Sequence, residues 1–234
     1  MRTKAVFFDL GGTLLVMRRD RVFRSVLAEA GMEVGLEQIH TAYLKVESWW
    51  LSTYGNRKMN PEQTDRAYRD LDAKVFLDLF PKGAPEKSER IARLAGERWP
   101  ELEKTIPLEL YSDALPLLER LSKDGYIMAL VSNAPPDTGR AVDALGLPRY
   151  LRTVIISGVV GYSKPHPEIF RIALRQSGVQ PEETIHVGDL YESDVVGARN
   201  AGIDGILIDR EGTQTGVDCP RIGSLAEVYD HLKR

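Results

Sequence analysis

The sequence predicts an α/β protein with a doubly wound parallel sheet and an all-helical domain inserted after the first strand. Two observations predict this fold. In the C-terminal part of the chain, short apolar runs of strand length alternate with helical segments, as in a parallel sheet covered by helices on both faces. Between residues 17 and 107, apolar side chains recur only at helical spacings of three and four. We therefore expect an α/β core of residues 1–16 and 108–234 and a helical domain of residues 17–107.

The elements of the predicted core follow one another in a regular order. The first strand covers residues 5–8 and ends at Asp9. Four more apolar runs predict strands at residues 126–131, 153–156, 184–187 and 205–208. Helices are expected at residues 114–123, 138–145, 167–177, 194–201 and 224–232. The first four of these helices stop within two residues of a glycine, the residue that most often ends a helix.

Composition argues against several other classes of protein. Of the 234 residues, 43% are hydrophobic and 28% are charged, which is typical of soluble globular proteins. The net charge of −3 argues against a nucleic-acid partner, and no apolar run approaches the ~20 residues that span a bilayer. The single cysteine, Cys219, excludes an internal disulfide and a cysteine-built zinc site. With no secretory pattern at the N-terminus, we expect a cytoplasmic protein, monomeric or homodimeric, with no membrane partner.

Polar side chains stand directly after several of the predicted strands. Parallel α/β sheets bind ligands at the carboxyl ends of their strands, where these side chains would meet. Paired aspartates favour a hard divalent cation such as Mg²⁺, and lysine and serine side chains suit phosphate oxygens. The candidates, in chain order, are Asp9, Ser132, Asn133, Lys164, Asp189 and Asp194.

These residues belong to four short motifs, which resemble those of the haloacid dehalogenase-like (HAD) hydrolase superfamily, in the branch with a helical cap. The resemblance covers nearly the whole chain. Any one motif alone is a weak signal, but four in order at strand ends are a strong one. The motifs are DLGGTL at residues 9–14, VSN at 131–133, SKPHPEIF at 163–170 and HVGDLYESD at 186–194.

The resemblance implies a Rossmann-like core and a reaction at phosphorus. Asp9 would be the nucleophile that forms an aspartyl-phosphate. Ser132 would hydrogen-bond the transferring group, and Lys164 would offset charge on both Asp9 and that group. The helical domain would be a cap that closes over the site and contacts a small phosphorylated substrate.

The resemblance also implies a set of ligands for Mg²⁺ and for phosphate. Mg²⁺ would be bound by Asp9, the backbone carbonyl of Gly11 and Asp189. Asp194 would lie behind these ligands or bind the ion through water, and it would orient Lys164. The residues expected around the phosphate are Gly11, Gly12, Thr13, Ser132, Asn133 and Lys164.

The sequence departs from the family's phosphatase pattern at Gly11. Phosphatases of the family carry a second aspartate at this position, which protonates the leaving group and then activates water. Such a group typically contributes ~10²–10⁴-fold to the rate. Three interpretations are open: a weak or specialised phosphatase, a dehalogenase or phosphonatase, and a catalytically reduced binding or regulatory protein.

Other residues partly discriminate among these interpretations. Asp189 and Asp194 are both retained, which favours a metal and counts against dehalogenation. A phosphonatase would need a cap lysine that forms a Schiff base. Lys45, Lys58 and Lys74 are present, but nothing in the sequence marks one of them as activated. The sequence therefore favours a magnesium-dependent hydrolase of small phosphorylated metabolites.

Overall fold

The chain folds into one α/β unit and one helical unit. The computed structural model describes residues 2–16, 19–55, 57–80, 85–105 and 107–232. The α/β unit contains residues 1–16, 55–61 and 109–234, and the helical unit contains residues 17–54 and 62–108.

A six-stranded, wholly parallel sheet forms the centre of the α/β unit, in the order β3-β2-β1-β4-β5-β6. This confirms the predicted fold class. Strand β1 lies in the middle, with Phe8 opposite Leu130 of β2 and Val187 of β4. Strand β6 is absent from our predictions because its two residues carry no apolar run. The strands are β1 (Ala5–Phe8), β2 (Ile127–Ser132), β3 (Thr153–Ile156), β4 (Thr184–Gly188), β5 (Asp204–Ile208) and β6 (Arg221–Ile222).

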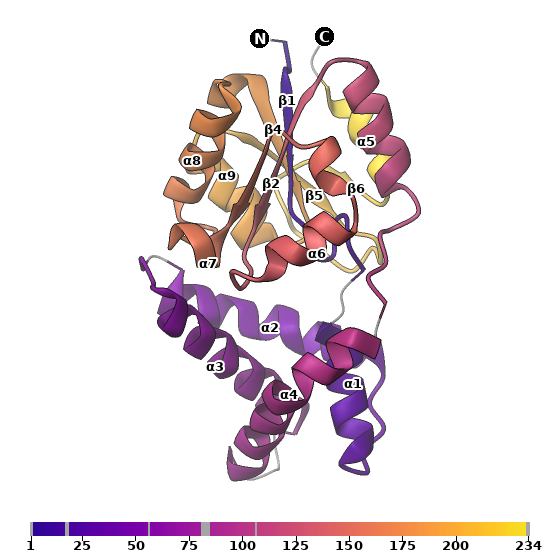
Figure 1. Ribbon diagram of the computed structural model, residues 1–234, viewed down its shortest axis with the longest axis vertical. Coiled ribbons are helices and arrows are strands. Elements are labelled where there is room, and N and C mark those ends of the chain that lie inside the picture. The colour runs from indigo at the N-terminus through magenta and orange to yellow at the C-terminus, as the bar shows by residue number, and fades with distance from the viewer. Residues whose placement is uncertain (1, 17–18, 56, 81–84, 106, 233–234) are drawn as a thin grey trace. The chain divides into compact units, whose positions relative to one another are not determined.

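Helices cover both faces of this sheet (Figure 1). On one face, α8 and α9 pack with apolar side chains of the sheet such as Phe7 and Val131, which are fully buried. The helix α5 lies on the opposite face beside the C-terminal 3-10 helix. The α-helices are α5 (Ala114–Lys123), α6 (Thr138–Ala144), α7 (Ser157–Val160), α8 (Pro167–Ser177) and α9 (Gly197–Arg199), and the 3-10 helices are η1 (Leu147–Arg149), η2 (Pro181–Glu183) and η4 (Leu225–His231).

Two predicted helices have a different form. The helix expected at residues 224–232 is the 3-10 helix η4, and the helix expected near Asp194 begins earlier. The sequence predicts a helix at residues 194–201, but the chain turns at Tyr191–Val196 as a π-helix (η3) and only then continues as α9. In this wide turn, Asp194 Oδ2 accepts a hydrogen bond from the backbone N of Leu190, the residue before η3, at 3.0 Å. Single π-turns are frequently found at functional sites.

The described residues of the helical unit form four helices, and the helical spacing predicts this all-helical character. These are α1 (Arg19–Glu29), α2 (Leu36–Tyr54), α3 (Pro61–Leu79) and α4 (Pro85–Thr105). Aromatic side chains contribute to its interior: the Phe23 and Phe76 rings lie 4.7 Å apart, and Trp50 stacks on Tyr68 at 5.9 Å.

Residues 55–61, which comprise the connection between α2 and α3 and the first residue of α3, group with the α/β unit. Within that unit, Met59 N donates to Gly161 O at 3.0 Å, so this connection is held against the segment that precedes Lys164. The division into core and cap domains at residues 16/17 and 107/108 stays a prediction.

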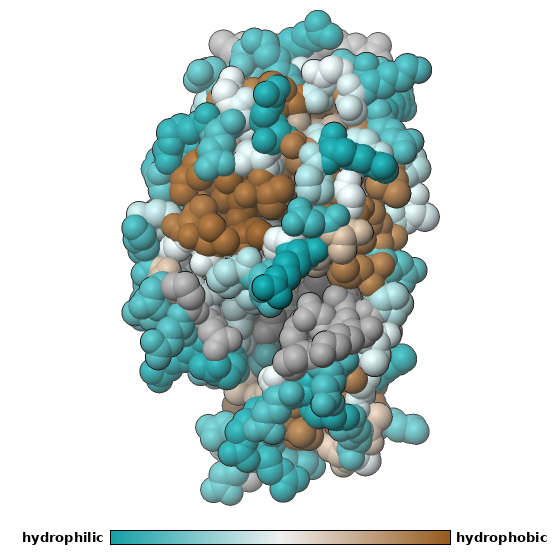
Figure 2. Space-filling model, in the orientation of Figure 1, coloured by the Kyte–Doolittle hydropathy of each residue, from teal (hydrophilic) through white to brown (hydrophobic). Residues whose placement is uncertain are grey.

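Most large apolar side chains in the described part of the chain are buried. The only large hydrophobic side chain strongly exposed among these residues is Val159 of α7, at 66%. Figure 2 shows hydrophilic residues over much of the face that it draws, with several apolar areas on the α/β unit, the largest at the upper left. Among the described helices, none combines the length and the apolar character needed to span a bilayer.

Candidate active site

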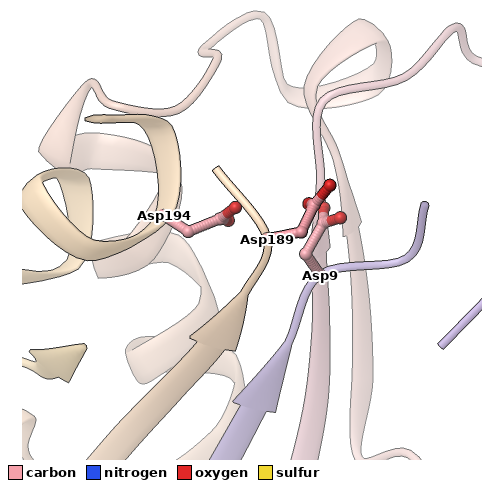
Figure 3. Close-up of side chains that lie close together, drawn as sticks. All are labelled: Asp9, Asp189 and Asp194. Atoms are coloured by element: carbon pink, nitrogen blue, oxygen red, sulfur yellow. The ribbon is translucent and has the colours of Figure 1, made fainter. Parts of the chain in front are cut away.

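Three aspartates come together at the carboxyl ends of the two central strands. Asp9 follows β1, Asp189 follows β4, and Asp194 projects from η3 toward them (Figure 3). Each offers a carboxylate oxygen, and these oxygens all lie within 4.8 Å of one another. Asp9 and Asp194 are buried, and Asp189 is half-buried. The topology thus brings Asp9 close to two aspartates that lie 180 or more positions further along the chain.

A buried lysine links two of these carboxylates. Lys164 Nζ lies 2.5 Å from Asp9 Oδ1 and 2.6 Å from Asp194 Oδ1, and its side chain is only 2% exposed. Burial alone would lower the pKa of Lys164, but the two carboxylates raise it well above the ordinary lysine value. Lys164 is therefore a permanent cation at the centre of the cluster.

The two carboxylates that share Lys164 have different affinities for a proton. Burial, together with repulsion from Asp194, raises the pKa of Asp9 from 3.8 to about 6, although Lys164 opposes the shift. Burial also acts to raise the pKa of Asp194, but Lys164 and His186 outweigh it and hold that pKa far below its usual range. Asp194 is thus the stable anion of the pair, and Asp9 is the carboxylate with the higher affinity for a proton.

The side chain of Asn133 holds the backbone of Lys164. Lys164 N donates to Asn133 Oδ1 at 2.7 Å, and Asn133 Nδ2 donates to Lys164 O at 2.8 Å. This pair of hydrogen bonds ties the end of β2 to the segment that carries the lysine. The structure gives Asn133 a positioning role that the sequence does not reveal, and a contact with phosphate stays a prediction.

His186 contributes to the site although the sequence suggested no role for it beyond membership of a motif. It lies on β4, fully buried, with Nε2 2.9 Å from Asp194 Oδ1. Its ring packs edge-on against Phe170 at 5.0 Å. Burial lowers the pKa of His186, which favours the neutral ring. A titratable residue between two apolar neighbours of the strand, Ile185 and Val187, was the available signal.

The loop after Asp9 turns sharply against the loop that carries Asp189. Gly12 has a φ of +75°, and a Cβ at this position would lie 2.1 Å from Asp189 Oδ2. Only glycine therefore fits here. Gly12 N donates to Leu15 O at 2.8 Å, so this amide closes the turn itself.

The remaining predicted residues lie beside this turn. Gly11 bridges to Leu15 in the same loop, two positions after Asp9. Thr13 is fully buried, and its carbonyl accepts a hydrogen bond from Arg210 at 2.8 Å. Ser132 is the last residue of β2 and is buried at the same edge of the sheet.

The cluster suits a hard divalent cation. Its three members offer carboxylate oxygens, the ligands that Mg²⁺ prefers. Both oxygens of Asp194 already accept hydrogen bonds, from Lys164 and His186 on one side and Leu190 on the other. Asp9 and Asp189 are therefore the better placed direct ligands, and Asp194 is better placed to orient Lys164.

Comparison with known proteins identifies the family. The sequence profile of the haloacid dehalogenase-like hydrolases matches residues 3–202. A phosphoserine phosphatase of Thermus thermophilus is 38% identical, with 97% of this chain and 98% of the relative covered. A glyceraldehyde 3-phosphate phosphatase of Pyrococcus furiosus is 30% identical, with 86% of this chain and 79% of the relative covered.

Solved structures share the fold at lower identity. The HAD-hydrolase YfnB of Bacillus subtilis, solved with magnesium bound, superposes with a TM-score of 0.71 at 19% identity and covers 99% of both chains. A 2-haloacid dehalogenase of Pseudomonas syringae superposes with a TM-score of 0.58 at 23% identity and covers 97% of both chains. At these identities the likeness concerns the fold alone. The family profile and the two phosphatase relatives together place this chain in the haloacid dehalogenase-like hydrolase family.

Proposed function

We propose that this chain is a magnesium-dependent phosphatase of small phosphorylated metabolites that works through an aspartyl-phosphate on Asp9. The observation that carries the proposal is the buried Lys164 bridge between Asp9 and Asp194, with Asp189 beside it. Two relatives that cover most of this chain are phosphatases of small phosphate esters, which supports the same reaction class.

The proposed reaction has two steps at phosphorus. In the first, an Asp9 oxygen attacks phosphorus, the bond from phosphorus to the ester oxygen breaks, and the leaving oxygen takes up a proton. In the second, water attacks the phosphorus of the aspartyl-phosphate, which releases phosphate and a proton and regenerates Asp9.

The residues around Asp9 are suited to this transfer of charge. Lys164 remains cationic and compensates the negative charge that Asp9 and the phosphoryl group bring together. Ser132, at the end of the neighbouring strand, would donate a hydrogen bond from its hydroxyl group to a phosphoryl oxygen. A magnesium ion held by Asp9, Asp189 and the carbonyl of Gly11 would neutralise phosphate charge when bound.

Gly11 sets a limit on the reaction. This position has no side chain to protonate the leaving group or to deprotonate water. The reaction therefore lacks a group that typically raises the rate ~10²–10⁴-fold. We therefore infer slow turnover of alkyl phosphates, or a substrate that supplies a good leaving group or its own proton donor. The helical unit, as a cap, is the proposed source of substrate contacts in a cytoplasmic protein, monomeric or homodimeric.

Two other functions are less well supported. Dehalogenases are among the proteins of the same fold, but the paired Asp189 and Asp194 favour a metal-dependent reaction. Gly11 is the one observation that favours a binding or regulatory protein, because it removes the proton-transfer group without disturbing Asp9, Lys164 or Asp189.

A substrate panel distinguishes these functions. Phosphate release would be measured from phosphoserine and glyceraldehyde 3-phosphate with and without Mg²⁺, and halide release from a 2-chlorocarboxylic acid. A phosphonoaldehyde with borohydride would trap any Schiff base. We expect magnesium-dependent phosphate release alone. Halide release without metal or a trapped Schiff base would contradict the proposal, as would no phosphate release even from an activated aryl phosphate.

A further inference from the structure

A turn that follows β5 reaches back to both loops that carry the candidate metal ligands. We define the β5–β6 turn as residues 209–214. From one end of it, Arg210 Nη2 donates to the carbonyl of Thr13 at 2.8 Å. From the other end, Gln214 Nε2 donates to the carbonyl of Asp189 at 2.9 Å. Thr13 belongs to the loop after Asp9, so one turn contacts the Asp9 loop and the Asp189 loop.

A buried carboxylate fixes the conformation of the β5–β6 turn. The side chain of Asp209 is 3% exposed. Its two oxygens accept hydrogen bonds from Thr213 N at 3.1 Å and Gln214 N at 3.0 Å. Arg221 Nη1, on β6, lies 3.3 Å from Asp209 Oδ2. Because a buried charge that loses its partners is costly, Asp209 resists any movement of the turn away from β5 and β6.

The Arg210 end of the turn is fixed independently. Arg210 makes a two-pronged ion pair with Asp113, with both oxygens at 3.0 Å, and its guanidinium lies 3.6 Å from the centre of the Tyr111 ring. Planar pairing of this kind fixes direction as well as distance. The hydrogen bond to Thr13 therefore comes from a side chain with little freedom to follow the loop.

The two acidic loops also meet each other directly. Gly12 approaches the Asp189 carboxylate so closely that a Cβ would lie 2.1 Å from Oδ2. Three contacts thus form a closed set: the turn with Thr13, the turn with Asp189, and Gly12 with Asp189. The distance between Asp9 and Asp189 then depends on a third strand, β5, as well as on β1 and β4.

We propose that the β5–β6 turn is a positioning element that holds the Asp9 and Asp189 loops at the separation a divalent cation requires. Gln214 and Arg210 are its positioning residues, and neither touches the reacting atoms. Gln214 has the more direct effect because its donor contacts the backbone of Asp189 itself. The cation belongs to the proposed function, on which this inference rests.

Magnesium binding by the full-length protein tests the role of Gln214. Gln214→Met keeps the length of the side chain and removes the donor. Gln176→Met makes the same change at an exposed glutamine of α8 and serves as the control. By isothermal titration calorimetry, we expect the Mg²⁺ dissociation constant to rise about 10-fold or more in Gln214→Met, the range found when groups that orient metal ligands are removed. We expect it to change less than about twofold in the control, with equal melting temperatures. Wild-type affinity in Gln214→Met would overturn the proposal.

Hydrogen exchange without metal separates this inference from the proposed function. We expect peptides covering residues 186–190 to exchange faster in Gln214→Met than in Gln176→Met, and peptides covering residues 9–16 to exchange faster in Arg210→Met than in wild type. If wild type neither binds Mg²⁺ nor releases phosphate, the proposed function fails, and faster exchange in these peptides still supports the positioning role. Unchanged exchange in both variants refutes it.

Discussion

Lys164 and Asp194 form an ion pair inside the α/β unit: Nζ lies 2.6 Å from Oδ1, and the two side chains are 2% and 0% exposed. The same ammonium group reaches Asp9 at 2.5 Å. Asp194 is held in turn by His186 and by the backbone of Leu190. Lys164, the cation paired with the candidate nucleophile Asp9, is therefore held in place through Asp194, which is itself fixed by His186 of β4 and by the backbone of Leu190 before η3.

Removal of Lys164 should destabilise the protein as well as inactivate it. Lys164→Met leaves two buried carboxylates without their cation, and breaking a buried pair in this way typically costs ~3–5 kcal/mol. Lys4→Met is a suitable control because the Lys4–Glu183 pair has a lysine that is 60% exposed, and such surface pairs contribute ~0–1 kcal/mol. Urea unfolding measures both free energies. Equal losses in the two variants would contradict a buried, paired Lys164.

Substitution of Gly12 should disturb the second acidic loop. Gly12→Ala would strain the backbone by ~1–2 kcal/mol and would also force the Asp189 carboxylate to move. Gly178→Ala carries a similar strain, with a φ of +72° and no atom within 4 Å of the added Cβ. We expect both variants to lose similar stability and only Gly12→Ala to lose activity. Full activity in Gly12→Ala at saturating Mg²⁺ would refute this contact.

The hydrogen bond from His186 should matter for catalysis through Asp194. His186→Gln can place an amide nitrogen where Nε2 lies, whereas His186→Leu cannot. Loss of partners that orient such carboxylates typically costs ~10–100-fold, so we expect a reduction of that size in kcat for the leucine variant and a smaller one for glutamine. Equal kcat values in the two variants would mean that His186 acts only through its volume.

The network around Asp113 should make stability depend on pH. Partial burial alone would raise the pKa of Asp113, but hydrogen bonds from Arg210, Leu225 and Ser224 lower it below 3.8. A carboxyl group whose pKa is lower in the folded state stabilises the protein above its unfolded-state pKa and loses that contribution as the pH falls. We therefore expect wild type to exceed Asp113→Asn in unfolding free energy at pH 6, and the difference to shrink as the pH falls below 3.8. A difference that does not depend on pH would contradict the shift.

Much of the fold could be predicted because the apolar pattern reports burial directly. Strand β3 and helices α5 and α8 have the predicted bounds, since an apolar run marks the strand and a glycine lies within two residues of the end of each helix. The start of the helix near Asp194 could not be predicted in this way. The Asp194 carboxylate is bound by Lys164, His186 and Leu190, so contacts outside the helix decide the local conformation.

The residues of the site could be predicted from the sequence, but the hydrogen bonds that hold them in place could not. Asp9, Lys164, Asp189 and Asp194 follow strands or lie in motifs, so sequence order alone places them at one edge of the sheet. Two hydrogen bonds depend on side-chain directions that no local pattern encodes: the one from Asn133 to the backbone of Lys164 and the one from Gln214 to the backbone of Asp189. The β5–β6 turn lies outside all four motifs and has no apolar periodicity, so the sequence gives it no functional signal.

Hydrolysis of an activated aryl phosphate tests the central claim, that Asp9 attacks phosphorus, most directly. The aryl leaving group needs little proton donation, so the missing acid at Gly11 does not limit this reaction. Wild type, Asp9→Asn and Gly11→Asp would be compared with and without Mg²⁺. We predict magnesium-dependent turnover in wild type that falls to background in Asp9→Asn. Wild-type turnover in Asp9→Asn would contradict the claim, as would an inactive wild type in which activity appears only after Gly11→Asp.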